Sequence, residues 1–322
     1  MLPILLVDTG RKKKQYLGKC VLFLLNFCQS FDKVYGELES GSNRRKSGVQ
    51  EPPIYDDEES FSKGEVSIMA RDTKILAVAG KGGVGKTSIS SAFVRLIAEA
   101  HKDARILAID ADPAIGLSTA LGVEPKETLD DIRKKIVTSV ESGAPKEAIE
   151  ILGEARYRIF DTMVEKNRFS FLAIGRPESA GCYCKVNAYL KEVISLLADE
   201  FDYVIIDGEA GIEQINRRVM EKVTHLFLVT DPSRKGTQVI DTIKKVADEL
   251  VMYDKCGAIV NRIPNEDAIP FIKIESAEVL AYIPDDREHA DNDIKGLSIF
   301  DLPEDAPVIK GAREALTKMA II

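Results

Sequence analysis

The chain has 322 residues, of which 45% are hydrophobic and 30% are charged, as is typical of a soluble globular protein with one large domain or two smaller ones. Its net charge of −8 excludes a general electrostatic attraction to nucleic acid or to an anionic membrane, so we expect neither as a partner. The five cysteines have no regular disulfide spacing and no apolar run approaches the roughly 20 residues that span a bilayer, so we expect a reducing, cytoplasmic location.

The first part of the chain differs from the rest. Residues 1–68 contain two short apolar patches, at 2–7 and 21–27, which are separated by a basic run at 11–14. A secretory signal would place its charges before a single apolar core, so this pattern fits one poorly. We predict that residues 1–68 are an N-terminal extension, either a poorly ordered arm or the result of a translation start placed too early. Residues 69–322 are then the folded domain.

From residue 69 onward, short apolar runs alternate with segments of helical periodicity. We predict strands at residues 75–79, 105–109, 169–174, 203–206, 225–229, 257–260 and 279–283. This alternation predicts an α/β fold, doubly wound, with a mostly parallel sheet and helices on both faces. The charged stretch 127–167 is mostly helical in pattern, and we expect it to be an insertion packed beside the sheet. Ligands of such sheets bind at the carboxyl ends of the strands.

A glycine-rich loop follows the first predicted strand and precedes a helical segment. It matches the phosphate-binding pattern G-x-x-x-x-G-K-[ST] at every fixed position, so a glycine turn without function is the weaker alternative. Backbone N–H groups and the helix N-terminus would face the anion, Lys86 would contact the β- and γ-phosphates, and the Thr87 hydroxyl would bind Mg²⁺. The predicted nucleotide contacts are Gly80, Lys81, Gly82, Gly83, Val84, Gly85, Lys86, Thr87 and Ser88.

Acidic residues follow two other predicted strands. Asp110 and Asp112 come directly after the second strand, where they would face the phosphates and where one plausible role is to orient and deprotonate the attacking water. The alternative is an Asp that caps the short helix after Pro113. Asp207 ends the strand at 203–206 in a Walker B arrangement and would hold Mg²⁺, directly or through water, unless it merely ends the strand. The small residues at 208–212 are typical of a loop that moves with the γ-phosphate.

Lys81, the second residue of the phosphate loop, marks a resemblance to the deviant Walker A ATPases, the MinD/ParA/nitrogenase-iron-protein class. The resemblance covers most of residues 69–322. It implies a P-loop NTPase fold, ATP as the nucleotide, and a homodimer with ATP at the interface. In that class the equivalent lysine reaches across the dimer to the phosphates of the partner, so Lys81 and Lys86 would both act in catalysis.

The same resemblance implies roles for residues outside the loop. Asp112 would be the catalytic acid of switch I, and residues 207–211 would form switch II. Asn261 and Arg262, which follow a late strand, and Pro284, which follows the last one, would line the adenine.

Cys182 and Cys184 form a Cys-x-Cys pair after the strand at 169–174. Two thiolates cannot supply the four ligands that a soft metal prefers, but two copies of the pair across a two-fold axis would make a Cys₄ site. Such a site suits Zn²⁺, Ni²⁺ or, with wider separation, an iron–sulfur cluster. The alternative is two small residues in a turn that precedes a helix.

The stretches 175–184 and 208–213 resemble the CooC-type nickel-insertion ATPases, which mature the metal cluster of carbon monoxide dehydrogenase. This resemblance implies an ATP-hydrolysing metallochaperone with a client apo-metalloenzyme, and it carries the metal role onto Cys182 and Cys184 alone. Two alternatives stay open: a MinD/ParA-like positioning or partitioning ATPase, and an iron–sulfur, ATP-dependent reductive activator.

Two further features bear on those alternatives. Cys256 opens a strand that should be buried, so we interpret it as a core residue, and this ranks an electron-delivering reductase below a metallochaperone. Residues 308–322 carry apolar residues at helical spacing with lysine and arginine between them. We favour a helix packed on the sheet over an amphipathic helix that lies on a membrane.

Overall fold

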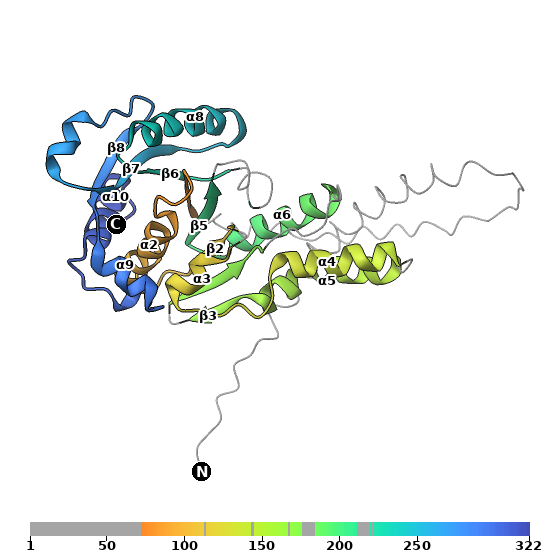
Figure 1. The fold of residues 1–322 in the computed structure, drawn as a ribbon. Helices are drawn as coiled ribbons and strands as arrows, with labels where there is room; N and C mark the ends of the chain where they lie inside the picture. Colours follow the sequence, from red (N-terminus) through yellow and green to blue (C-terminus); the bar gives the residue numbers. More distant parts are fainter. Residues whose placement is uncertain are drawn as a thin grey trace, which may run out of the picture. The chain divides into compact units, whose positions relative to one another are not determined.

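The computed structural model describes residues 72–112, 114–142, 145–166, 168–175, 184–210, 219 and 222–322 (Figure 1). The predicted extension at 1–68, Cys182 and residues 211–213 lie outside this description. Cys184 begins a helix, and its side chain also lies outside the description.

One sheet of eight strands runs through the described residues, in the order β3-β4-β2-β5-β1-β6-β7-β8. β3 pairs antiparallel with β4, and all other neighbouring strands pair in parallel. The strands are β1 (Lys74–Gly80), β2 (Ile106–Asp110), β3 (Val164–Lys166), β4 (Phe169–Ala173), β5 (Tyr203–Ala210), β6 (His225–Thr230), β7 (Lys255–Ile263) and β8 (Glu278–Pro284). The carboxyl ends of the seven parallel strands therefore meet at one edge of the sheet, which we call the carboxyl edge; the opposite edge is the amino edge.

Different helices cover the two faces of the sheet. Successive strand side chains point to opposite faces, so Leu76 and Val78 of β1 join one apolar cluster, whereas Ala77 and Ala79 join another. The first cluster includes α2, α3 and α10, and the second includes α4, α5, α6 and α8. The helices are α2 (Lys86–Ala100), α3 (Gly116–Leu121), α4 (Leu129–Glu141), α5 (Pro145–Thr162), α6 (Cys184–Ala198), α8 (Arg234–Leu250), α9 (Arg287–Ile294) and α10 (Pro307–Lys318), with short 3₁₀ turns η1 (Glu266–Phe271) and η2 (Ile299–Asp301).

The predicted fold class is confirmed: the sheet is mostly parallel, both faces carry helices, and each of the seven predicted strands is present. Two details differ from the prediction. Residues 164–166, expected within a helical stretch, form the short edge strand β3, whose three residues are too few to show a pattern. β5 continues through Gly208 to Ala210, where we expected a loop, because Ala210 still pairs with Gly80 of the neighbouring strand.

The C-terminal helix α10 packs on the sheet. Its apolar residues Val308, Ile309, Ala312 and Leu316 are buried in the cluster that also holds α2, and Figure 1 shows the two helices side by side. Its apolar face is therefore already covered by protein, as the favoured interpretation of residues 308–322 requires. No helix in the described part of the chain is long and apolar enough to cross a membrane.

Candidate nucleotide-binding site

The phosphate loop connects β1 to α2 and lies against the end of β6. Gly80 has φ +154°, and a Cβ at this position would come within 2.0 Å of the Val229 carbonyl oxygen. Only glycine allows this approach, because neither backbone can move without breaking the pairing of β1 with β6. The loop is thereby fixed at the carboxyl edge of the sheet, and α2 begins at Lys86 with its N-terminus facing the same side.

The two lysines of the loop make different contacts. The Lys86 side chain is 8% exposed and its Nζ donates to the Lys81 carbonyl oxygen at 3.1 Å, so it lies across the loop that it is predicted to serve. The Lys81 side chain instead leaves the loop, and its Nζ lies 2.6 Å from Oδ2 of Asp231, directly after β6. One lysine thus faces inward across the cradle, and the other pairs with a neighbouring strand end.

Thr87, Ser90 and Asp207 form a buried polar cluster beneath the loop. Asp207, at 1% exposure, accepts hydrogen bonds from the Thr87 hydroxyl on Oδ2 and from the Ser90 hydroxyl on Oδ1, each at 2.8 Å. Burial raises the pKa of Asp207 to about 6, although these hydroxyls and Lys86 oppose the shift. The predicted Mg²⁺ residues Thr87 and Asp207 are therefore in direct contact.

Asp110 and Asp112 have different surroundings. Asp110 is fully buried and accepts the backbone N–H groups of Asp112 at 3.1 Å and Leu117 at 2.9 Å, so it holds the turn between β2 and α3. Burial and the nearby Asp207 raise the pKa of Asp110 to about 7. Asp112 is partly exposed, and within the described part of the chain its side chain accepts the Ala114 N–H at 2.8 Å. Of the two acids, Asp112 is the one whose carboxylate is accessible to a ligand.

This arrangement fits Mg²⁺. The ion prefers oxygen ligands and commonly takes one or two from protein side chains, with phosphate oxygens and water completing the shell. Thr87 and Asp207 supply such oxygens, and burial raises the pKa values of Asp110 and Asp207 by more than their hydrogen bonds and, for Asp207, the nearby Lys86 lower them. A cation at this edge would oppose that effect of burial.

The residues expected at the adenine lie at the ends of β7 and β8. Asn261 is buried, and its amide donates to the Val84 carbonyl oxygen of the phosphate loop at 2.9 Å, while its Oδ1 accepts the N–H of Arg262. Pro284 ends β8 and is exposed. Asn261 thus supports the phosphate loop itself. Contact of Asn261, Arg262 and Pro284 with adenine stays a prediction.

The cysteine pair can be placed only through its chain neighbours. Ile174, directly after β4, donates its N–H to the Asp110 carbonyl oxygen at 2.8 Å and accepts the N–H of Asp130 at 2.9 Å. In the sequence, the segment that contains Cys182 therefore follows a residue that is bonded to the Asp110 backbone, and it precedes α6. Among the described residues, no group of three or more His, Cys, Asp or Glu side chains is arranged to hold a metal ion.

Cys256 is a partly buried thiol that packs against the apolar cluster of α4, α5, α6 and α8. It lies in β7, and burial raises its pKa to about 12, so the thiol stays protonated at neutral pH and is a poor metal ligand. Cys256 therefore packs against the core, but it is less buried than its interpretation as a core residue implies.

The sequence interpretation missed Ser90 and Asp231. Ser90 lies three residues after Thr87 on α2 and so shares its helix face, which is a signal that could have identified it. Asp231 follows β6 at its carboxyl end, where the other site acids were sought. Its partner Lys81 is 150 residues away in the chain, and only the pairing of β1 with β6 brings the two together.

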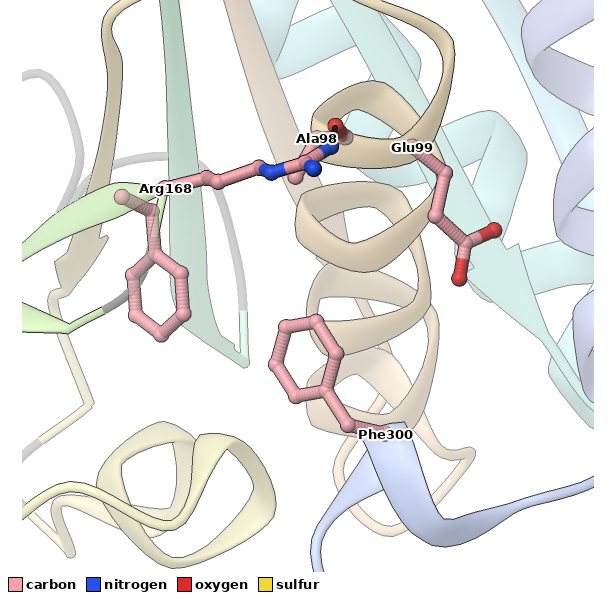
Figure 2. Close-up of a pocket in the computed structure, with 5 residues that line it drawn as sticks. Ala98, Glu99, Arg168 and Phe300 are labelled. Atoms are coloured by element: carbon pink, nitrogen blue, oxygen red, sulfur yellow. Dashed lines mark hydrogen bonds between the residues drawn. The ribbon is translucent and has the colours of Figure 1, made fainter. Parts of the chain in front are cut away.

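A separate cavity of about 540 Å³ lies at the other end of α2, lined by Ala98, Glu99, Arg168, Phe169 and Phe300 (Figure 2). The Phe169 and Phe300 rings stack with centroids 5.9 Å apart, and Arg168 donates to the Ala98 carbonyl oxygen at 3.1 Å. A helix of 15 residues is about 22 Å long, so this cavity is far from Lys86 and is not the nucleotide site.

Comparison with known proteins identifies the family of the chain. Residues 75–299 match the CobQ/CobB/MinD/ParA nucleotide binding domain. An uncharacterised ATP-binding protein of Methanocaldococcus jannaschii is 35% identical over 249 residues, 76% of this chain and 98% of that protein. The carbon monoxide dehydrogenase accessory protein CooC of Rhodospirillum rubrum is 31% identical over 242 residues, 70% of this chain and 89% of that protein. The crystal structure of the Pyrococcus furiosus cell division ATPase MinD has the same fold, with a TM-score of 0.54 and 22% identity over 77% of this chain and 98% of that one.

Proposed function

The chain belongs to the CobQ/CobB/MinD/ParA nucleotide-binding family, and from this premise we propose that it is an ATP-hydrolysing, dimerising metallochaperone. Its cargo would be nickel or another soft metal, and its client a metalloenzyme such as carbon monoxide dehydrogenase, as the name of the similar CooC protein suggests. One observation carries the proposal: in the sequence the Cys182-x-Cys184 pair follows β4, whose carboxyl end lies at the edge that also holds the phosphate loop, and Cys184 is the first residue of α6.

The nucleotide chemistry rests on residues of this chain. Lys86 and the backbone of the loop bind the β- and γ-phosphates, and Asp112 orients the attacking water and accepts its proton. Mg²⁺ held by Thr87 and Asp207 would neutralise charge on the phosphates. Ser90 fixes the Asp207 carboxylate so that its second oxygen stays directed at Thr87.

A dimer supplies what one chain lacks. Two thiolates leave a soft metal under-coordinated, whereas Cys182 and Cys184 from both subunits make a four-sulfur site. ATP would close the dimer and bring the pairs together, and hydrolysis would open it and release the metal to the client. If ATP and metal both favour the closed dimer, each must tighten the binding of the other.

A short physical connection supports this coupling. The Asp110 carbonyl oxygen accepts the Ile174 N–H, and the Ile174 carbonyl oxygen accepts the Asp130 N–H at the start of α4. Asp110 holds the turn that carries Asp112. A shift of that turn on hydrolysis would therefore act directly on the backbone from which the cysteine segment departs.

Nickel binding to the purified protein, measured anaerobically by equilibrium dialysis with ATP, with ADP and without nucleotide, tests the proposal. We expect one metal ion per dimer, bound more tightly with ATP. The double variant C182S/C184S should lose this binding, whereas Cys256→Ser is a matched control that should retain it, because the Cys256 thiol is protonated and partly buried. A C182S/C184S protein that still binds one metal per dimer would refute the site.

A positioning or partitioning ATPase is the second candidate, because the same family includes MinD and ParA. This function predicts ATP-dependent pelleting with anionic vesicles or with DNA that does not depend on the cysteines. Its membrane form gains no support from α10, whose apolar residues are buried against the sheet. Pelleting that persists in the C182S/C184S variant would favour this candidate over metal delivery.

A further inference from the structure

The ion pair between Lys81 and Asp231 is a contact of the phosphate loop that the nucleotide chemistry described above does not explain. Lys81 Nζ lies 2.6 Å from Asp231 Oδ2, and the two side chains are 32% and 25% exposed. This geometry is a short, charge-assisted hydrogen bond, which is stronger than an ordinary surface ion pair. In this state the Lys81 ammonium is neutralised by its own chain.

Neighbouring groups hold the Asp231 carboxylate, which is the acceptor, in a fixed position. The second oxygen of Asp231 accepts the backbone N–H of Ser233 at 3.0 Å and also the Ser233 hydroxyl. Gly236 leaves room for this carboxylate, because a Cβ there would come within 2.3 Å of Asp231 Oδ1. Burial raises the pKa of Asp231, but the bonds from Lys81 and Ser233 outweigh it and hold the pKa below its usual value. Asp231 is therefore a fixed, ionised carboxylate.

The position of Asp231 relative to the loop is equally fixed. Asp231 follows Val229 by two residues, and the Val229 carbonyl oxygen is the group against which Gly80 packs. The strand end that carries the carboxylate and the loop that carries Lys81 are thus in direct contact. A phosphate in the cradle and the Asp231 carboxylate would compete for the same ammonium group.

We propose that Asp231 is a positioning residue that holds Lys81 within its own subunit until a triphosphate displaces it, and so sets the ATP concentration at which two subunits close. This inference rests on the proposed ATP-dependent dimer. In that dimer Lys81 would reach the phosphates of the partner, as the resemblance to the deviant Walker A ATPases implies, so each Lys81 must first leave its carboxylate. Asp231 thereby opposes closure when no γ-phosphate is present to replace it.

Asp231→Asn is the decisive variant, because the amide oxygen can still accept from Ser233 while the charge that holds Lys81 is lost. The matched control is Asp248→Asn. It breaks a lysine–aspartate ion pair of 2.7 Å between Lys244 and Asp248, which both lie on α8. Thermal unfolding without nucleotide should show that both variants are folded.

The first measurement does not depend on a dimer. Nucleotide-free protein is treated briefly with an amine-acylating reagent, and the modification of Lys81 is followed by mass spectrometry. We expect Lys81 to react roughly five- to tenfold faster in Asp231→Asn than in the wild type, since a charged hydrogen bond is lost, and to be unchanged in Asp248→Asn. Equal rates in the wild type and Asp231→Asn would overturn the inference.

The second measurement is the ATP concentration that gives half-maximal dimer in sedimentation velocity. We expect this concentration to fall roughly five- to tenfold in Asp231→Asn and to stay at the wild-type value in Asp248→Asn. An unchanged or higher concentration in Asp231→Asn would overturn the restraint on closure. If the wild type forms no dimer with ATP, the proposed dimer fails together with the role of Asp231 in closure, while the acylation rates still decide whether Asp231 holds Lys81.

Discussion

Charged side chains have different surroundings at the two edges of the sheet. At the carboxyl edge, Asp110 and Asp207 are buried and have pKa values raised to about 7 and about 6, mainly by burial. At the amino edge, Lys74 and Lys255 donate to the carbonyl oxygens of Ala320 and Met319, at 3.3 and 2.9 Å, and fasten the C-terminal residues to the sheet. At the amino edge the chain's own carbonyl oxygens bind the two lysines, whereas the negative charge of the carboxylates at the carboxyl edge is only partly compensated by the chain.

This difference separates stability from function within one sheet. Buried carboxylates without enough positive charge cost folding free energy, and such costs are concentrated at sites whose ligand relieves them. A substitution at the carboxyl edge should therefore change activity far more than stability, or even raise stability. A substitution at the amino edge should change stability alone.

The largest expected effect is that of Lys86→Ala at the carboxyl edge. Removing a cation that stabilises the charge of the transferred phosphoryl group should lower ATP hydrolysis by roughly 10² to 10³-fold. The measurement is steady-state phosphate release at saturating Mg·ATP. We expect a smaller effect on the thermal midpoint without nucleotide, of the size that follows from losing the hydrogen bond to the Lys81 carbonyl oxygen, about 1 kcal/mol.

Lys255→Ala is the matched control at the amino edge. It also removes one lysine and one bond to a carbonyl oxygen, that of Met319, so it should cost about 1 kcal/mol of stability. Hydrolysis at temperatures well below unfolding should stay at the wild-type rate. If Lys255→Ala reduced hydrolysis as much as Lys86→Ala, the two edges would not differ as described.

The next effect is that of Asp207→Asn, which should act on activity and stability in opposite directions. Loss of the carboxylate that would hold Mg²⁺ should lower hydrolysis by about 10²-fold. The Asn side chain can still pair with the Thr87 and Ser90 hydroxyls, since each hydroxyl can donate or accept. Without nucleotide, and with a chelator present, the variant should be the more stable protein at pH 8.

The expected gain in stability of Asp207→Asn depends on pH, and its sign follows from the raised pKa of Asp207. Because the pKa of Asp207 is about 6 in the folded chain and 3.8 for an unperturbed Asp, the folded state binds one more proton than the unfolded state between these pH values. The stability of the wild type should therefore fall as pH rises from about 4 to about 6, by of order 3 kcal/mol from this group. Urea unfolding from pH 4 to 8 should show a smaller fall in Asp207→Asn. An identical pH profile would show that Asp207 is not the buried charge we infer.

Part of this contrast could be predicted from the sequence, for physical reasons. Buried parallel strands are continuous apolar runs, so β1, β2 and β6 were found with nearly correct ends, and the phosphate loop is a local pattern. Asp110 and Asp112 look equivalent in sequence, because the burial of Asp110 and the turn between the two residues exist only in the folded structure. Asp231 was missed because its role depends on strand order, and β3 because three residues show no periodicity.

The smallest expected effect, that of His225→Gln, sharpens the comparison from the amino edge. His225 begins β6, is 7% exposed and lies within hydrogen-bond distance of the Thr224 hydroxyl, at 2.8 Å. Its pKa is lowered by burial and by the nearby Lys255 and Lys74, so the folded state favours the neutral ring.

The unfolded chain takes up a proton below about pH 6.5 before the folded chain does. The contribution of His225 to stability is therefore present above that pH and is lost as pH falls. Gln cannot titrate, so urea unfolding from pH 5 to 8 should show a shallower loss on the acid side, by at most about 1.4 kcal/mol per pH unit, with wild-type ATP hydrolysis at pH 8. The slope has the opposite sign to that of Asp207, so a variant that steepened the acid-side loss would contradict the assignment of a neutral, buried histidine to this edge.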